Sequence, residues 1–145
     1  MKGMTPIVRN TARLLSAFVM LFGLYVTLTG HLSPGGGFTG GVLLMAGVVL
    51  MVLSFGGDRA IEMTTKGRCG LFDALGALGF ALVALVGLFV GGFFINWLPP
   101  GQEHKLFSGG TILVCNVAIA VKVSAGLIGI FLALVLGTRR AMPKE

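Results

Sequence analysis

Four polar side chains stand in or beside long apolar runs of this sequence, and their types are those that carry ions and protons. Lys122 and Asn116 share one apolar run, Asp73 follows the start of another, and His31 lies in a glycine-rich segment. Ionisable residues are rare at such positions unless they serve a function, because a charge is costly there. The chemistry that these residues predict is the movement of charge rather than the breaking of bonds.

Lys122 is the outstanding member of this set, because it lies near the middle of an apolar run. On a helix with about 100° between residues, its neighbours on one face are all small. They are Thr111, Cys115, Ala118, Ala125, Gly126, Gly129 and Ala133. Because small residues permit close helix packing, we expect Lys122 to point into protein or a hydrated cavity. It then serves an ion path, a proton relay or a coupling charge, or forms a structural pair between subunits. The plainer alternatives are a lysine that reaches the interface or stays neutral in a packed core.

The acids of the chain offer Lys122 no obvious partner. They are Asp58, Glu62, Asp73, Glu103 and Glu145. Asp73 comes nearest, but its place at the start of an apolar run puts it about two to three helical turns from mid-membrane. A buried ammonium needs a carboxylate, carbonyl oxygens or water. We therefore expect another polypeptide or a shared water cavity to supply that partner, which makes the chain a subunit.

The other three polar residues each allow two interpretations. Asn116 lies about 120° from Lys122 around the helix, so it faces a different neighbour, either as a link between helices or in an ion path. Asp73 is an interfacial acid near Arg68 or a proton entry group. His31 is a hydrogen-bonded loop anchor or a group that titrates near neutral pH.

The segment from Gly30 to Gly41 contains six glycines in twelve residues. So much glycine indicates backbone that packs closely or adopts conformations closed to other residues. It is no phosphate-binding loop, because no Gly-Lys-Ser/Thr follows, and no strand precedes it as a dinucleotide fingerprint requires.

The apolar runs predict the helices that carry these residues. The chain has 145 residues, 55% of them apolar and 11% charged, far below the charge of about 25% typical of soluble domains. Runs at about 11–29, 38–55, 71–98 and 109–137 are each long enough for a bilayer, which needs roughly 20 residues. We predict an all-α integral membrane protein of one domain over 1–145, with four transmembrane helices in up-down order, short loops and a retained first helix.

Basic residues set the expected orientation. Nine of them fall before or at the start of the first run, between the second and third, or after the fourth, whereas only Lys105 falls on the other side. By the positive-inside rule both termini are predicted to be cytoplasmic, with the loops 31–37 and 99–108 facing outward. No basic patch remains for nucleic acid.

Several kinds of chemistry find no support in the residues. Cys69 and Cys115 are expected at different depths, so we predict neither a disulfide nor a metal site. The sequence has no HExxH, no paired carboxylates and no nucleophile–base–acid set. We predict a chain that is no enzyme and holds no cofactor.

Two motifs resemble the signatures of one family. Gly30-His31-x-x-Pro34-Gly35-Gly36-Gly37-Phe38-x-Gly40-Gly41 resembles the signature of the B subunit of multisubunit Na⁺/H⁺ antiporters of the Mrp (Mnh) type. Phe107-Ser108-Gly109-Gly110-Thr111, continued through Asn116 to Lys122-Val123, resembles a second signature of that domain. The resemblance covers about residues 5–140. The domain also occurs in membrane-bound hydrogenases and similar complex-I-like assemblies.

The resemblance implies a non-catalytic subunit of a Na⁺/H⁺ antiporter in the prokaryotic cell membrane. It implies lipid and other membrane subunits as partners, with a C-type subunit adjacent, and His31, Asn116 and Lys122 lining or gating a cation path. The alternative is the homologous subunit of a membrane-bound hydrogenase or another complex-I-related respiratory complex. A self-sufficient four-helix exporter or homo-oligomeric channel and a purely structural, lipid-contacting subunit are the further alternatives.

Overall fold

The computed structural model describes residues 4–32, 34–56, 68–98 and 108–141. Within them the chain forms four helices: α1 (Pro6–Thr29), α2 (Gly37–Phe55), α4 (Arg68–Val90) and α5 (Thr111–Ala141). All four are long and apolar enough to cross a membrane. The prediction of an all-helical protein with four such segments is confirmed.

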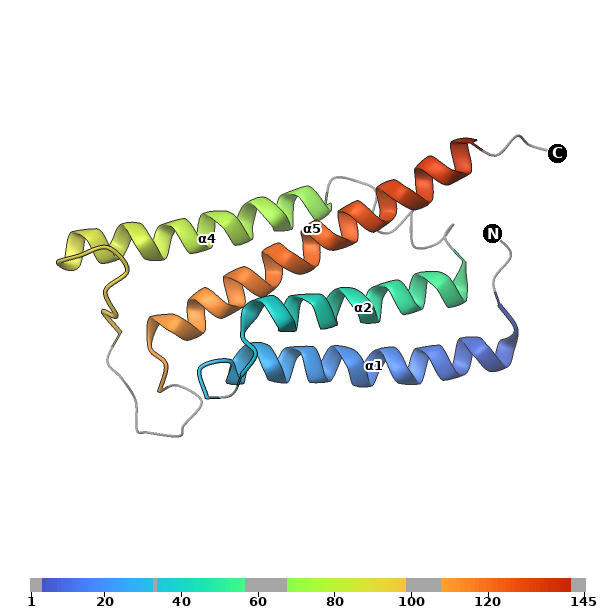
Figure 1. Cartoon of the computed structure of the whole chain (residues 1–145), viewed down its shortest axis with the longest axis horizontal. Helices are drawn as coiled ribbons and strands as arrows, with labels where there is room; N and C mark the ends of the chain where they lie inside the picture. Colours follow the sequence, from blue (N-terminus) through green and yellow to red (C-terminus); the bar gives the residue numbers. More distant parts are fainter. Residues whose placement is uncertain (1–3, 33, 57–67, 99–107, 142–145) are drawn as a thin grey trace.

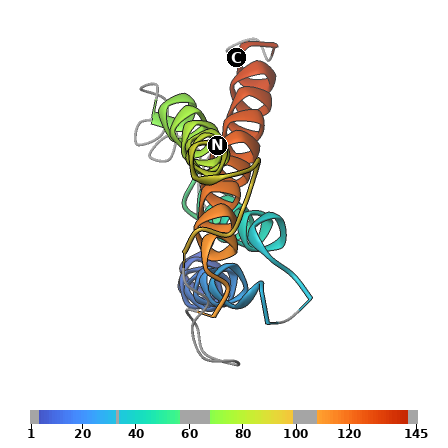
Figure 2. The same cartoon turned by 90° about the vertical axis from the view of Figure 1, so that its left-hand side faces the viewer.

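The helices form a row rather than a closed bundle, in the order α1, α2, α5, α4 (Figures 1 and 2). α1 packs along α2, α5 crosses α2 obliquely, and α4 packs against the far side of α5. A row exposes more apolar surface than a bundle, and large side chains such as Phe18, Leu21 and Phe89 stand exposed. Such a surface suits lipid or partner helices, because water would not solvate it favourably.

The third apolar run is the one whose helix differs most from the predicted bounds. α4 begins at Arg68 and ends at Val90, whereas the run predicted a helix over 71–98. Gly91 adopts a φ of 142° and donates its N–H to the Gly87 carbonyl at 3.2 Å, which ends the helix before the proline pair at 99–100. The chain then turns back, so Trp97 stands in a non-helical segment rather than at a helix end. The other runs end within a few residues of expectation, with α1 beginning earlier, at the helix-starting Pro6.

α4 is displaced along α5, so their ends are not level (Figure 1). A Cβ added to Gly129 would lie 3.8 Å from the Cβ of Cys69, in the first turn of α4, and one added to Gly126 would lie 3.7 Å from Asp73 Oδ1. α5 continues for several turns beyond that level, to Ala141. The start of α4 therefore lies beside the middle of α5, and this register decides the depth of Asp73.

Glycines bring the helix backbones together on both sides of α5. A Cβ atom added to Gly41 of α2 would lie 2.9 Å from the Ala120 carbonyl oxygen, and one added to Gly76 of α4 would lie 2.8 Å from that of Ala118. Real Cβ atoms do not approach oxygen so closely, so a larger residue would force the helices apart. Small residues thus permit the contacts that fix the register of α2 and α4 on α5.

Candidate functional site

Lys122 and Asp73 form an ion pair between α5 and α4. The Lys122 Nζ lies 3.1 Å from Asp73 Oδ1, within hydrogen-bond distance. The prediction that another polypeptide or a water cavity would supply the counter-charge was wrong, because Asp73 of this chain supplies it. Counting turns from the start of each run had placed Asp73 too far from Lys122, since that count assumes helices with level ends. The displacement of α4 along α5 brings Asp73 to the depth of Lys122.

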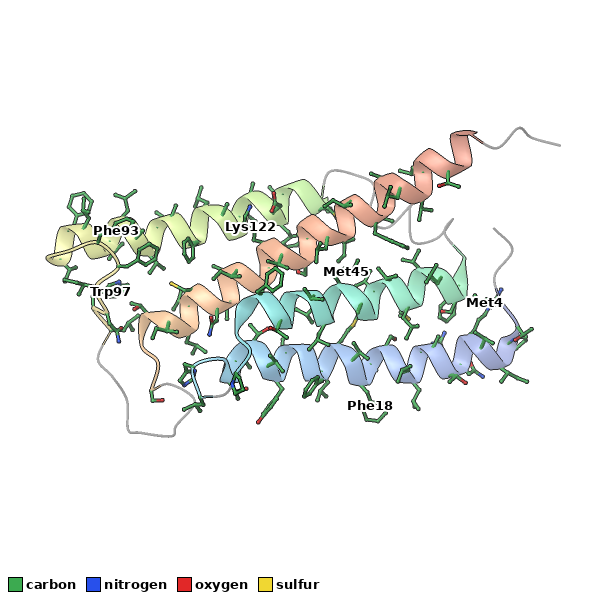
Figure 3. All side chains as sticks on the ribbon, viewed as in Figure 1. Met4, Phe18, Met45, Phe93, Trp97 and Lys122 are labelled. Carbon is green, nitrogen blue, oxygen red and sulfur yellow. The ribbon has the colours of Figure 1, made fainter. Side chains whose placement is uncertain are left out.

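Two glycines make room for the pair. A Cβ added to Gly76 would lie 2.8 Å from the Lys122 Cβ, and one added to Gly126 would lie 3.7 Å from Asp73 Oδ1. Figure 3 shows Lys122 projecting from α5 at its crossing with α4. We call this group of Lys122, Asp73, Gly76 and Gly126 the charged seam. The small-residue face predicted around Lys122 is the face that meets α4.

The charged seam is not covered by the described part of this chain. The side chains of Lys122 and Asp73 are 48% and 44% exposed. An ammonium has three donors and a carboxylate has two acceptor oxygens, but one bond joins them here. Both residues belong to helices that can span a membrane. The remaining donors and acceptor need water or polar groups from beyond the described residues, because lipid tails offer none.

Asn116 lies at a separate place, where α5 meets the start of α2. Its Oδ1 accepts a hydrogen bond from the Gly37 N–H at 3.4 Å. A Cβ added to Gly30 would lie 2.9 Å from its Nδ2, and one added to Gly37 would collide with the Asn116 carbonyl oxygen. We call Gly30, Gly36, Gly37 and Asn116 the glycine cradle. As its angle around the helix predicted, Asn116 faces a different neighbour from Lys122.

Within the glycine cradle, the amide of Asn116 is only half satisfied. Its Nδ2 is buried and has no hydrogen-bond partner among the described residues. The orientation of the amide follows from Gly37, whose N–H requires an acceptor. This geometry favours the role of Asn116 as a link between helices, and leaves the two N–H donors of Nδ2 for small acceptors such as water.

His31 and the remaining motif residues surround the glycine cradle without entering the charged seam. The His31 ring packs on Gly109, whose added Cβ would lie 2.9 Å from the His31 Cγ. The two sequence motifs therefore meet in space. Around them, Pro34 and Phe38 are exposed, Gly35 contacts Val26, Gly40 contacts Thr27, and Gly41 contacts α5.

Asn96 is a structural residue that sequence reasoning missed. Its Oδ1 accepts hydrogen bonds from the backbone N–H and the hydroxyl of Thr111, each at 2.9 Å. It thereby caps the start of α5, and a Cβ at Gly110 would collide with it. The sequence holds no signal for this cap, because Asn96 is not adjacent to the helix it caps and reaches it only through the turn after α4.

The candidate site residues thus form two groups rather than one. The charged seam and the glycine cradle are separated along α5 by about 9 Å, the rise of the six residues from Asn116 to Lys122. Cys69 and Cys115 are free thiols. Among the described residues no three His, Cys, Asp or Glu side chains gather as metal ligands would.

Comparison with known proteins gives consistent matches over most of the chain. A family model described as a domain related to the MnhB subunit of Na⁺/H⁺ antiporter matches residues 7–129. A Staphylococcus aureus protein (strain Newman), named for an antiporter subunit, mnhB2, is 31% identical over 140 residues, which cover 89% of this chain and 98% of that protein.

Two further relatives are longer than this chain. An uncharacterized protein of Methanocaldococcus jannaschii is 35% identical over 132 residues, 85% of this chain and 49% of that protein. Among solved structures, a chain of the membrane-bound sulfane sulfur reductase, an archaeal respiratory membrane complex, is 33% identical with a TM-score of 0.71. That match covers 90% of this chain and 57% of the other. This chain spans only about half the length of these two relatives.

Proposed function

Because this chain belongs to the family of domains related to the MnhB subunit of Na⁺/H⁺ antiporters, we propose that it is a non-catalytic subunit of a multisubunit Na⁺/H⁺ antiporter. Residues 1–145 act as one domain in a prokaryotic cell membrane, with helices in up-down order and both termini in the cytoplasm. A C-type subunit is its neighbour. The observation that carries the proposal is the half-exposed Lys122–Asp73 pair between two membrane-spanning helices.

The charged seam couples the two ions through competition for one carboxylate. Asp73 neutralises Lys122 when no other cation is near. A sodium ion that reaches Asp73 from the exposed side competes with the Lys122 ammonium for the carboxylate and weakens this pairing. When the sodium ion leaves, the pair forms again. The glycines of the charged seam leave the space that such an exchange requires.

The glycine cradle serves the same path from a second position. Asn116 and His31 lie on the predicted outward side of the charged seam, where they line the approach of the cation. Their neighbours include glycines, so polar groups of the main chain lie close to both side chains. Neighbouring subunits complete the wall of the ion path, since the described part of this chain leaves the side chains of the charged seam about half exposed.

A second candidate function has its own support. The similarity to a chain of an archaeal respiratory membrane complex favours the same subunit in an assembly where electron transfer drives ion pumping. The two functions predict different companions. Purification of the native complex, with mass spectrometry of its subunits, distinguishes them: iron–sulfur or hydrogenase subunits support the respiratory complex, and only antiporter subunits support the antiporter.

The decisive experiment for the ion path is Lys122→Ala in the native complex. We expect Na⁺-dependent proton transport in membrane vesicles to fall by at least about tenfold, equivalent to 1.4 kcal/mol. Assembly, measured on native gels, should survive because alanine suits the small-residue face. The matched control is Ser124→Ala, which removes only a hydroxyl bonded to the Val121 carbonyl of its own helix. Normal transport by Lys122→Ala would refute the role of the charged seam and favour a purely structural subunit.

A further inference from the structure

A groove runs along α5 and α4 beside the charged seam, and its second part shares Gly76 with that seam. Its first part, with a volume of about 380 Å³, lies between the start of α4, the middle of α5 and Val48 of α2. Its second part, about 510 Å³, continues toward Leu28 of α1. Phe72 and Val121 line both parts, so the two are continuous.

The floor of the groove consists of residues with small side chains, and its walls consist of residues with large ones. We call this groove the slot. Gly76, Gly79 and Ala118 form the floor of the second part, while Leu75 and Val117 stand beside them. The lining of α5 extends from Leu113 to Ile128, about 22 Å at the rise of an α-helix. That length exceeds half of a hydrocarbon core of about 30 Å, so one acyl chain of a single leaflet fits along it.

Arg68 stands at the end of this apolar slot. Its side chain is exposed and lines the first part of the groove. It has no ion-pair or hydrogen-bond partner within residues 4–32, 34–56, 68–98 and 108–141. Arg13 instead lies over the Phe55 ring at 5.2 Å. Arg68 is thus a cation without a counter-charge among the described residues, and it lies beside a mostly apolar slot.

We propose that this groove binds an anionic phospholipid, with the phosphate at Arg68 and one acyl chain in the slot. Basic pockets between transmembrane helices at the cytoplasmic side are suited to anionic head groups. This proposal does not depend on ion transport, because the lining of the slot includes neither Lys122 nor Asp73.

A lipid fits the slot better than a helix of another subunit does. Close helix packing favours small residues across the whole contact face. Here the small residues lie only at the floor, and Phe72, Leu75 and Val121 would keep a second helix backbone away. A flexible hydrocarbon chain enters between such walls, and the phosphate of the same lipid supplies a counter-charge that Arg68 does not find among the described residues.

The first test measures lipid bound to the purified complex. The complex is exchanged into phosphatidylcholine vesicles containing cardiolipin, extracted again, and its retained cardiolipin is quantified by mass spectrometry. We expect Arg68→Gln to lower retention about fivefold, the effect of losing one basic residue near an anionic lipid. Val121→Phe, which fills the junction of the two parts, should lower it as well. Arg13→Gln is the control and should leave retention unchanged. Equal retention by Arg68→Gln and the unaltered complex would overturn the proposal.

A second test uses the native thiol in the groove and needs no change to its lining. Cys69 lines the first part, so a benzophenone maleimide attached there, in a Cys115→Ala complex, samples what occupies the slot. Illumination should attach phospholipid to this chain, and a peptide carrying the lipid mass is the expected product. A cross-link to another subunit in place of lipid would show that a partner helix fills the groove, and would refute the proposal.

Discussion

Both sides of α5 make close contacts through glycines, but the polar group on one side is neutral and those on the other side are charged. Toward α2, the glycine cradle encloses a neutral amide, Asn116, which accepts a bond from the Gly37 N–H. Toward α4, the charged seam holds Lys122 and Asp73, which are about half exposed. A neutral group can be satisfied by backbone and buried, whereas a charged pair needs further polar contacts. The difference indicates that the chain's own backbone satisfies the side-chain carbonyl oxygen of Asn116, whereas the charged pair needs further polar contacts from its surroundings.

The largest expected effect comes from removing the carboxylate of the charged seam. Asp73→Ala leaves the Lys122 ammonium without its counter-charge, and the free energy of unfolding should fall by about 2 kcal/mol or more, somewhat below the loss for a fully buried pair. Thermal unfolding of the complex in detergent, followed by native gel, measures this.

The matched control for Asp73→Ala is the double variant Asp73→Asn/Lys122→Gln. It removes both charges while keeping the sizes and a hydrogen bond, so it should assemble better than the single variant. Equal stability of Asp73→Ala and the unaltered complex would mean that water already solvates Lys122. The ion pair would then contribute no stability, and the contrast with the glycine cradle would fail.

A smaller effect is expected at the glycine cradle. Gly37→Ala places a Cβ against the Asn116 carbonyl oxygen and 2.9 Å from the Ile119 Cβ. Overpacking of this kind should destabilise the chain by about 1–3 kcal/mol. The shift in melting temperature relative to Gly70→Ala, whose Cβ meets nothing within 4 Å, isolates the contact. If both variants melted alike, the cradle would be looser than its geometry indicates.

The cap at the start of α5 should matter less. Asn96→Ala removes the acceptor for the Thr111 N–H and hydroxyl and should cost about 1 kcal/mol. Asn96→Asp keeps a suitable oxygen and should recover most of the loss. Hydrogen exchange at the first turn of α5 is the measurement, and unchanged exchange in Asn96→Ala would exclude the capping role.

The smallest effect is a gain rather than a loss. Gly70 lies in α4 with open space around it, so Gly70→Ala should raise stability by about 0.5–1 kcal/mol through helix propensity. The same change at Gly76, where a Cβ would lie 2.8 Å from the Ala118 carbonyl oxygen, should destabilise. Melting temperatures of the two variants, compared directly, test whether glycine is required only at helix contacts.

Local patterns predicted a good part of this molecule. The apolar runs identified four helices, the small residues around Lys122 identified the face that meets α4, and the angle to Asn116 identified a second neighbour. These succeeded because helix periodicity fixes which residues share a face. The end of α4 was missed because the apolar run continues past Gly91, whose positive φ reverses the chain there.

The sequence by itself determined the membrane-spanning character, the family and the residues able to carry charge. Composition, run length and motif order are local properties, and they need no knowledge of how helices pack. Only the tertiary structure decided that Asp73 pairs with Lys122, that Asn96 caps α5, and that Arg68 borders an apolar slot. Each depends on the displacement of one helix along another or on a turn between them. Such a displacement is set by which small residues let two backbones meet, and that choice involves positions far apart in the chain.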